Sequence, residues 1–346
     1  MSKYLETIHF IREQFPGKDF VPLHEPKFNG NEKSYLLETI DSTYVSSVGP
    51  FVDKFEEMMA DLSGTSKTIA VVNGTSALQV ALRLVGVNNG DEVLTQALTF
   101  VATVNAILYN SAQPIFIDVD LDTMGLSPRA VATFLEEFGE IRDGFCFNKK
   151  TNKKIAACMP MHTFGFPVDL EELIIVCNNW NIPIVEDAAE SMGSEYKNRP
   201  VGSFGKLGVF SFNGNKIITS GGGGAIVTDD WELGAKAKHL TTTAKRPHPY
   251  EYVHDDMGYN FRMPNINAAL ACAQLEQLDL FLADKRNLAT AYANYFTTRG
   301  INFREEQPNT KANYWLMCIE LENKKDRDLF LKETNDNSVM TRPIWQ

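Results

Sequence analysis

Residues 210–224 read FSFNGNKIITSGGGG and present a single lysine, Lys216, between two apolar runs. The first run covers 207–212, and the second, 225–228, follows the glycines 221–224. The two runs predict strands, and because only a glycine turn separates them, the pair is expected to be antiparallel. A lysine held in a roomy loop between strands suits covalent chemistry on a carbonyl. A solvated lysine in a hairpin explains this window equally well.

Composition limits the classes of protein that need to be considered. The chain has 346 residues, which suffices for one large domain and a smaller one. Its net charge of -11 argues against nucleic-acid binding but allows a small phosphorylated ligand in a local pocket. No apolar run approaches the roughly 20 residues of a membrane span, and no signal-peptide core is present. The five cysteines lack CxxC spacing, so we expect a reduced, cytoplasmic protein without a metal site.

Upstream of Lys216 the chain alternates between short apolar runs and segments with helical spacing. This alternation predicts a mainly parallel sheet that is covered on both faces. Helices are expected at 32–42 and 51–62; strands at 68–73, 92–96, 114–119, 155–161 and 182–186; and further helices at 75–85, 101–109, 127–138 and 170–180.

The other segments suggest three domains. Residues 148–154 predict a solvated hairpin, and the polar, aperiodic stretch 241–261 is expected to be functional or a subunit contact. A long helix is expected at 264–281 and a second one up to 298. Two strands, at 314–321 and 339–344, are expected around a helix at 326–334. The predicted domains are an N-terminal arm (1–50), a large domain (51–282) and a small α+β domain (283–346).

Polar residues follow several of the predicted strands, at the edge where open parallel sheets bind ligands. Gly74, Thr75 and Ser76 open a helix directly after the first strand, where free amides and the positive helix end favour a phosphate. A cap that serves only the helix is the alternative. The segment is not a Walker loop, and no GxGxxG fingerprint follows the first strand.

Three more residues are placed by their strands at the same edge. Phe100 could stack on a planar ligand or belong to the core. Asp187 could hold a protonated ring nitrogen or cap a helix. His162 could face a ligand at this edge or be a structural histidine whose hydrogen bonds are made within the protein. A reactive lysine, an aspartate for a pyridine nitrogen, a helix N-terminus for a phosphate and an aromatic over the ring are together the requirements of pyridoxal 5′-phosphate.

The chain resembles the DegT-type sugar aminotransferases, which are fold-type I pyridoxal phosphate enzymes, from about residue 21 to 345. Segments 45–50 (VSSVGP), 74–78 (GTSAL), 186–190 (EDAAE) and 211–216 (SFNGNK) carry the resemblance. Segments 211–224 and 260–264 are most similar to the branch that makes 4-amino-4,6-dideoxy-N-acetylglucosamine nucleotides for legionaminic acid and bacillosamine synthesis. The resemblance implies an aspartate aminotransferase-like fold, with a mostly parallel seven-stranded sheet between helices and a smaller C-terminal α+β domain.

The resemblance also implies roles for individual residues. Lys216 would form a Schiff base with the cofactor and move the proton between it and the substrate carbon. Asp187 would pair with the ring nitrogen, Phe100 would stack on the ring, and Glu190 would lie near the ring hydroxyl, where the family often has glutamine. The phosphate would be bound by Gly74, Thr75, Ser76 and Ser211.

Further residues are implied to act from the substrate side or from a second subunit. Asn260 would reach the phosphate in the neighbouring subunit, so a homodimer or a larger homo-oligomer with shared active sites is expected. Substrate contacts are expected from Ser47, Gly49, His162 and Arg342.

The chain departs from the family pattern at a few places. Asn213 stands where histidine is common, and the glycine run lacks a glutamate found in relatives. The chain also stops at 342–346, where the family usually continues through another strand and helix, so we expect a truncated small domain. Lys216 is retained, whereas a sister group of dehydratases has histidine there, so transamination is favoured.

The expected activity is transfer of an amino group from L-glutamate to C4 of a nucleotide-linked 4-keto-6-deoxy-N-acetylhexosamine, giving a UDP-4-amino-4,6-dideoxy-N-acetylglucosamine type of product. Three alternatives stay open from the sequence. They are a C3 sugar aminotransferase, a cofactor-binding sensor without turnover, and a nucleotide-binding oxidoreductase, against which the missing GxGxxG counts. The nucleotide, uridine or guanosine diphosphate, is not determined.

Overall fold

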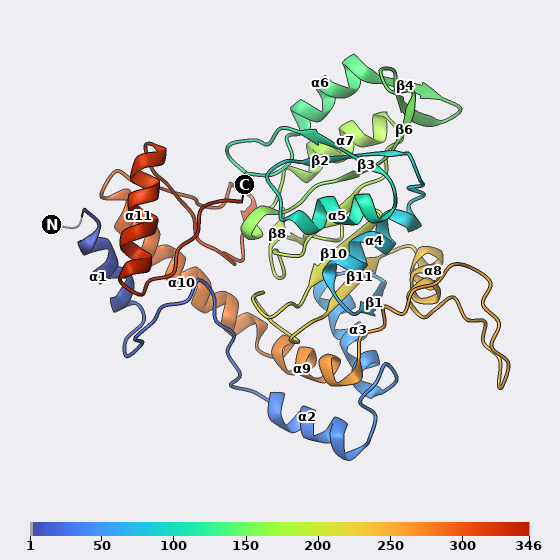
Figure 1. Cartoon of the computed structure of the whole chain (residues 1–346), viewed down its shortest axis with the longest axis horizontal. Coiled ribbons are helices and arrows are strands. Elements are labelled where there is room, and N and C mark those ends of the chain that lie inside the picture. Colours follow the sequence, from blue (N-terminus) through green and yellow to red (C-terminus); the bar gives the residue numbers. More distant parts are fainter. Residues whose placement is uncertain (1–2, 346) are drawn as a thin grey trace.

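A mixed β-sheet, covered by helices, forms the middle of the larger lobe of the molecule (Figure 1). The computed structural model describes residues 3–345 and contains two strand groups, β1–β11–β10–β7 and β3–β2–β6–β5–β4. Parallel bridges from Cys158 to Ile184 and from Met161 to Asp187 join β6 to β7. The described strands β1–β11–β10–β7–β6–β2–β3 therefore form one seven-stranded surface, in which β11 is antiparallel to its neighbours and the others are parallel. This confirms the predicted sheet and the predicted antiparallel pair.

The strands that form this surface are short and mostly apolar. Their bounds are β1 Lys67–Val71, β2 Glu92–Gln96, β3 Gln113–Ile117, β6 Lys153–Met159, β7 Val185–Asp187, β10 Leu207–Ser211 and β11 Gly224–Thr228. The hairpin expected at 148–154 is confirmed, since β5 (Phe145–Asn148) turns into the antiparallel start of β6. Strand β4 (Gly139–Arg142), which the sequence did not predict, pairs with β5 on its other side.

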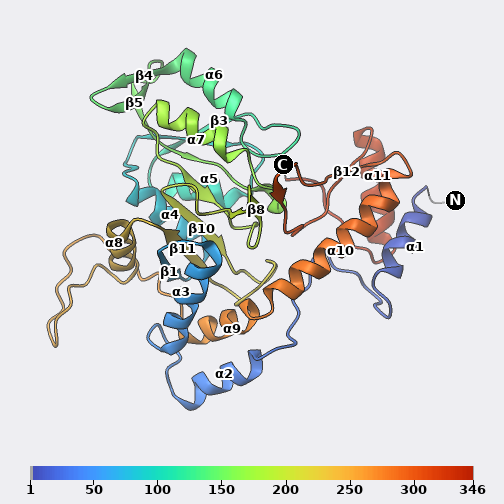
Figure 2. The same cartoon turned by 180° about the vertical axis from the view of Figure 1, so that it is seen from behind.

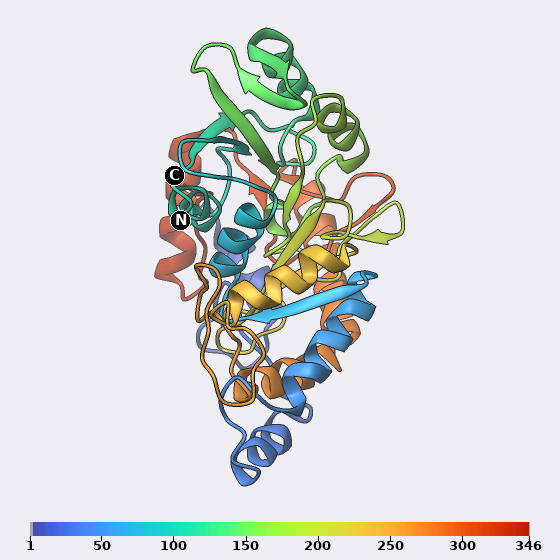
Figure 3. The same ribbon diagram turned by 90° about the vertical axis from the view of Figure 1, so that its right-hand side faces the viewer.

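Both faces of the sheet are covered, as the apolar runs predicted. Side chains alternate between two buried clusters, so that Ile69 and Val71 of β1 pack on one side and Ala70 on the other. Helices α4 (Gly74–Leu84) and α8 (Trp231–Thr241) cover the first side, and α3 (Pro50–Ser63) and α9 (Asn265–Leu275) cover the second. Figure 3 shows α8 lying against the edge strand β1.

The helices begin where the sequence supplies capping groups. Asn73 accepts a hydrogen bond from the backbone N–H of Ser76 at the start of α4. Ser127 does the same at α6 (Pro128–Phe138), and Asp169 at α7 (Leu170–Asn179). Each cap satisfies one of the four unpaired N–H groups of a helix start. The remaining elements near the sheet are α2 (Glu32–Asp41), α5 (Val101–Tyr109), the short 3₁₀ turn Thr163–Gly165, and β8 (Glu195–Tyr196), β9 (Arg199–Pro200) and β13 (Thr310–Lys311).

The chain between α8 and α9 forms an arm that projects away from the body (Figures 1 and 2). None of its described residues belongs to a regular strand or helix; isolated bridges, Thr242 to Asn260 and Lys245 to His254, and the ion pair of Arg246 with Asp255 join its two sides. The irregular stretch predicted at 241–261 is therefore confirmed. Large apolar side chains on this arm are exposed, including Tyr250, Tyr252 and Met257.

A second lobe lies at the opposite end of the molecule from the arm (Figures 1 and 2). It contains α1 (Leu5–Glu13), α11 (Lys324–Asp336), β12 (Asn302–Phe303) and β14 (Ile319–Glu320). Helix α10 (Leu278–Thr297) runs into it from the sheet side, and the boundary expected near residue 283 falls inside this helix. The rings of Tyr4 and Phe330 are 5.0 Å apart, so the N-terminal segment packs against α11.

Three local predictions for the C-terminal half were wrong. The helix expected at 264–281 ends at Leu275, and α10 starts a new helix at Leu278. Of 314–321 only Ile319–Glu320 is a strand; Tyr314 has a φ of 49°, and the backbone bends again at 315–316. Residues 339–344 form a single bridge, Val339 to Val21, because the segment turns its side chains toward a cavity instead of a partner strand. Residues 1, 2 and 346 of the expected terminal domains lie outside the described residues.

Within residues 3–345, no helix combines the length and the apolar character that crossing a bilayer requires.

Candidate active site

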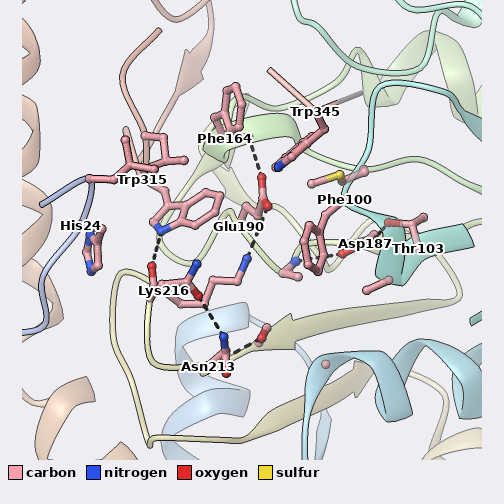
Figure 4. A pocket seen from close by; sticks show the side chains of 18 of the residues that line it. His24, Phe100, Thr103, Phe164, Asp187, Glu190, Asn213, Lys216, Trp315 and Trp345 are labelled. Carbon is pink, nitrogen blue, oxygen red and sulfur yellow. Dashed lines mark hydrogen bonds and ion pairs between the residues drawn. The ribbon is translucent and has the colours of Figure 1, made fainter. Parts of the chain in front are cut away.

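A cavity of about 1000 Å³ opens at the carboxyl ends of the central strands (Figure 4). Its wall includes the start of α4, the residues after β7, the loop after β10 and the C-terminal segment. Lys216 and Asp187 both line it. The topology predicted this edge of the sheet, because parallel strands place their following loops together.

Lys216 lies in the loop after β10, and its side chain is 12% exposed. Its Nζ is 3.4 Å from Glu190 Oε1 and 4.1 Å from the centre of the Trp315 ring. The indole is fixed in turn, since Trp315 Nε1 donates a hydrogen bond of 2.6 Å to the carbonyl of Asn215. A carboxylate and an aromatic face together hold the ammonium group in the cavity.

Asp187 ends β7 and is almost completely buried. Thr103 Oγ1 donates to Asp187 Oδ2 at 2.7 Å, and the backbone N–H of Ala189 donates to Oδ1 at 3.2 Å. Burial raises the pKa of Asp187, and these hydrogen bonds and the positive charge of Lys216 oppose that rise. A buried carboxylate supported in this way is a suitable partner for a protonated ring nitrogen.

Glu190 is also buried, directly beside Lys216. The backbone N–H of Phe164 donates to Glu190 Oε2 at 2.9 Å. Burial raises the pKa of Glu190 to about 7, with the charge of Lys216 acting in the opposite direction. The carboxyl group therefore changes its protonation state near neutral pH, next to the reactive amine.

The N-terminus of α4 closes another side of the cavity. Gly74, Thr75 and Ser211 line it. A Cβ on Gly74 would lie 2.9 Å from Ser211 Cβ, so this close approach requires glycine. Ser76 does not line the cavity, and its backbone N–H is occupied by Asn73 at 2.8 Å. The remaining amides and the positive helix end favour an anion at this point.

An aromatic wall flanks the opening (Figure 4). Phe100, at the start of α5, lines the cavity and is 49% exposed. Its ring lies 6.1 Å from that of Trp345, which is 4.9 Å from Phe164. The sequence analysis did not predict Phe164, Trp315 and Trp345 as site residues. None of them belongs to a recognisable local motif, and only folding brings them into the same cavity as Lys216.

His162 was expected to contact the substrate, but the structure places it elsewhere. It is completely buried and does not line the cavity. Its Nδ1 accepts a hydrogen bond of 3.2 Å from the backbone N–H of Val168. Nε2 is 3.1 Å from Glu186 Oε2, to which it can therefore donate. Both ring nitrogens are used by the protein, so the histidine is structural.

Ser47, Gly49 and Asn260 also lie outside the lining of this cavity. Gly49 precedes α3, in a turn that the side chain of Asn265 fixes by accepting from the backbone N–H of Phe51 at 3.0 Å. Asn260 Oδ1 accepts from Arg262 on the projecting arm at 3.1 Å. A single chain therefore does not bring these three residues to Lys216.

Arg342 is the expected substrate residue that does line the cavity. Its Nη1 donates to Asn335 Oδ1 at 3.0 Å and to the carbonyl of Thr341 at 2.7 Å. These bonds are made by the nitrogen on one side of the guanidinium, so further donors stay available.

Residues 26–346 match the DegT/DnrJ/EryC1/StrS aminotransferase family. The chain belongs to this family. It is 36% identical to the GDP-perosamine synthase of Escherichia coli O157:H7, over 94% of this chain and 85% of that protein. It is 33% identical to the GDP-perosamine synthase of Vibrio cholerae, over 94% of this chain and 84% of that protein.

Solved structures of aminotransferases have the same fold. TlmJ from Streptoalloteichus hindustanus superposes with a TM-score of 0.85 at 25% identity, covering 94% of this chain and 85% of that protein. DesI, solved in the presence of its TDP-sugar product, gives a TM-score of 0.83 at 25% identity, covering 99% of this chain and 83% of that protein. The family prediction and the predicted fold type are confirmed.

The aminotransferase is thus a pyridoxal phosphate-dependent, sugar-modifying transferase of the EC 2.6.1 class. The residues of the cavity fit this cofactor. A lysine, a buried carboxylate and a helix N-terminus line one space of about 1000 Å³, and an aromatic ring stands at its opening. A Schiff-base amine, a ring-nitrogen partner and a phosphate site are the groups that the cofactor needs.

Proposed function

We propose that the aminotransferase moves an amino group from L-glutamate to C4 of a nucleotide-linked 4-keto-6-deoxy-N-acetylhexosamine, with a uridine diphosphate as the nucleotide part. The observation that carries the proposal is the position of Lys216, whose amine shares one cavity with Asp187 and lies 3.4 Å from Glu190. The similarity of 211–224 and 260–264 to the legionaminic acid and bacillosamine branch supports the N-acetylated sugar.

The cofactor would be held by residues from four parts of the fold. Asp187 would pair with the ring nitrogen, and Phe100 would cover one ring face. Thr75 and Ser211, with the α4 amides that begin at Gly74, would bind the phosphate. Pyridoxal phosphate supplies an electron sink for the bond broken at the carbon that carries the amino group.

Lys216 would perform the proton transfers. As a neutral amine it would take the proton from the α-carbon of glutamate, and as an ammonium it would return a proton to C4 of the sugar. Glu190 would help to hold the proton between these steps, because its carboxyl group titrates near neutral pH beside the amine. Asp187 and Glu190 are both buried, which would limit the exchange of protons between the site and the solvent.

The experiment incubates the cofactor-loaded protein with glutamate and a panel of keto-sugar nucleotides, and reads the products by mass and NMR. We expect a C4-amino product from the UDP-linked N-acetyl sugar. GDP-linked 4-keto-6-deoxy sugars belong to the panel, because relatives are named GDP-perosamine synthases. Amination at C3, or turnover by a Lys216→Ala variant, would refute the proposal.

The proposed active unit is a homodimer. The arm between α8 and α9 exposes Tyr250, Tyr252 and Met257, and its residue Asn260 does not line the cavity of its own chain. An exposed apolar arm is a typical subunit contact. We propose that Asn260 completes the phosphate site of the partner subunit, and that Ser47 and Gly49 approach the partner's substrate.

A further inference from the structure

A second cavity, of about 230 Å³, adjoins the active site on the side of Lys216. It lies between the segment after α1, helix α10 and the C-terminal segment. His24 and Trp315 line both cavities, so the two spaces meet at these residues. In Figure 4, His24 stands at the end of the pocket where Lys216 and Trp315 lie, opposite Asp187.

The second cavity contains an ammonium group without an anionic partner. Lys285, on α10, donates a hydrogen bond of 3.1 Å to the carbonyl of Trp315. Among residues 3–345 it forms no ion pair with a carboxylate, and a lysine has three donors. Burial lowers the pKa of Lys285 to about 8, against the weaker influence of Asp284. The group is therefore still mainly charged at pH 7, and its charge is poorly compensated.

His24 is the second unused donor at the same place. Both of its ring nitrogens are buried, and neither has a hydrogen-bond partner within the described residues. Burial and, to a smaller extent, the positive charges of Lys285 and Lys216 lower the pKa of His24 to about 3, and the backbone of Lys216 acts in the opposite direction. The imidazole is therefore neutral and carries one N–H donor, close to both lysines.

The other charged groups around this cavity compensate Lys285 only in part. Lys18 is paired with Glu25, and Asp284, the neighbour of Lys285 on the same helix, opposes the effect of burial on Lys285 only weakly. Lys27 adds a further positive charge at the rim. The cavity is therefore electropositive, and its remaining walls are apolar, with Phe281, Leu288 and Met317 among them.

We propose that His24 and Lys285 form a subsite for one carboxylate of the amino donor. The carboxylate would accept hydrogen bonds from both side chains, and the methylene groups of a short dicarboxylate would lie against the apolar wall toward Lys216. A volume of about 230 Å³ suits a five-carbon dicarboxylate, whereas pockets for larger ligands span roughly 300–1,000 Å³. The nucleotide of the sugar substrate is thereby left to the larger cavity.

This proposal rests on the proposed amino donor, so its test separates donor binding from sugar conversion. The holoenzyme is titrated calorimetrically with glutarate, a five-carbon dicarboxylate that cannot react, and separately with UDP. Lys285→Met should raise the Kd for glutarate about 10- to 100-fold, as expected for loss of a charge-assisted hydrogen bond. It should leave the Kd for UDP unchanged. Lys285→Arg should retain glutarate binding.

Lys27→Met is the matched control, since it removes a positive charge from the rim of the same cavity but no proposed hydrogen bond; it should raise the Kd for glutarate far less than Lys285→Met and leave the Kd for UDP unchanged. An unchanged Kd for glutarate in Lys285→Met, or a loss that affects only UDP, would overturn the proposal. A second measurement needs no variant. Glutarate affinity of the unaltered holoenzyme should fall as the pH rises through about 8, where Lys285 loses its proton, and a flat profile would contradict the subsite.

Failure of the sugar proposal gives a different result. If no keto-sugar nucleotide is aminated but glutarate binding still depends on Lys285, the result supports the carboxylate subsite and refutes the proposed sugar substrate. If the Lys285→Met variant aminates sugars at the full rate at low glutamate concentration, the result refutes the carboxylate subsite and supports the proposed activity.

Discussion

Replacing Glu190 with glutamine tests the electrostatics of the site most directly. The substitution keeps the shape and the acceptor oxygen for the backbone N–H of Phe164, but removes the ionisable group. Burial raises the pKa of Glu190 from 4.5 to about 7. The folded protein therefore binds a proton at Glu190 between about pH 4.5 and 7, where the unfolded chain releases it.

The magnitude and its sign follow from this difference in pKa. A pKa difference between 4.5 and about 7 corresponds to about 3 kcal/mol, because one unit is worth roughly 1.4 kcal/mol. Since the folded-state pKa is raised, the favourable contribution is complete below pH 4.5 and is lost as the pH rises to about 7. Glu190→Gln should therefore gain stability relative to the unaltered protein on going from pH 5 to pH 8, by about 3 kcal/mol.

The assay is thermal unfolding of the cofactor-free protein at a series of pH values. The melting temperature of Glu190→Gln should rise by several degrees relative to the unaltered protein between pH 5 and 8. Glu136→Gln, an exposed change on α6, is the control and should show no such trend. If the difference between Glu190→Gln and the unaltered protein does not grow with pH, the burial argument for Glu190 is refuted.

Three other predictions concern the cofactor site and the assembly. Thr103→Val removes the 2.7 Å hydrogen bond to Asp187; the loss should weaken pyridoxal phosphate binding by about 1.5–3 kcal/mol, measured by fluorescence titration, and unchanged affinity would contradict the role of this bond. Gly74→Ala places a Cβ 2.9 Å from the Cβ of Ser211. The crowding should destabilise the fold by about 1–3 kcal/mol, measured as a lower melting temperature. Inactive Lys216→Ala and Asn260→Ala chains should regain activity when mixed, because one of the two shared sites then has both residues; absence of recovery would contradict the shared site.

Much of the site could be predicted from local sequence, because its residues follow strands. Asp187 comes directly after an apolar run, and Lys216 and Phe100 lie a few residues beyond theirs; parallel strands bring such positions to one edge. The same reasoning placed His162 there and left both a substrate contact and a structural role open; the geometry favours the structural role. Its ring turns into the protein, where Glu186 and the backbone of Val168 use both nitrogens, and no sequence pattern reports the direction of a side chain.

The amino-acid sequence by itself determined the alternation of strands and helices, the antiparallel last pair, the reactive lysine and the family to which it belongs. These properties depend on short-range periodicity, capping residues and motif spacing, which neighbouring residues carry. Only the tertiary structure decided that Trp315 covers Lys216, that Trp345 lies beside Phe100 and that His24 and Lys285 line one cavity. These residues are up to 261 positions apart in the chain, and packing alone brings them together.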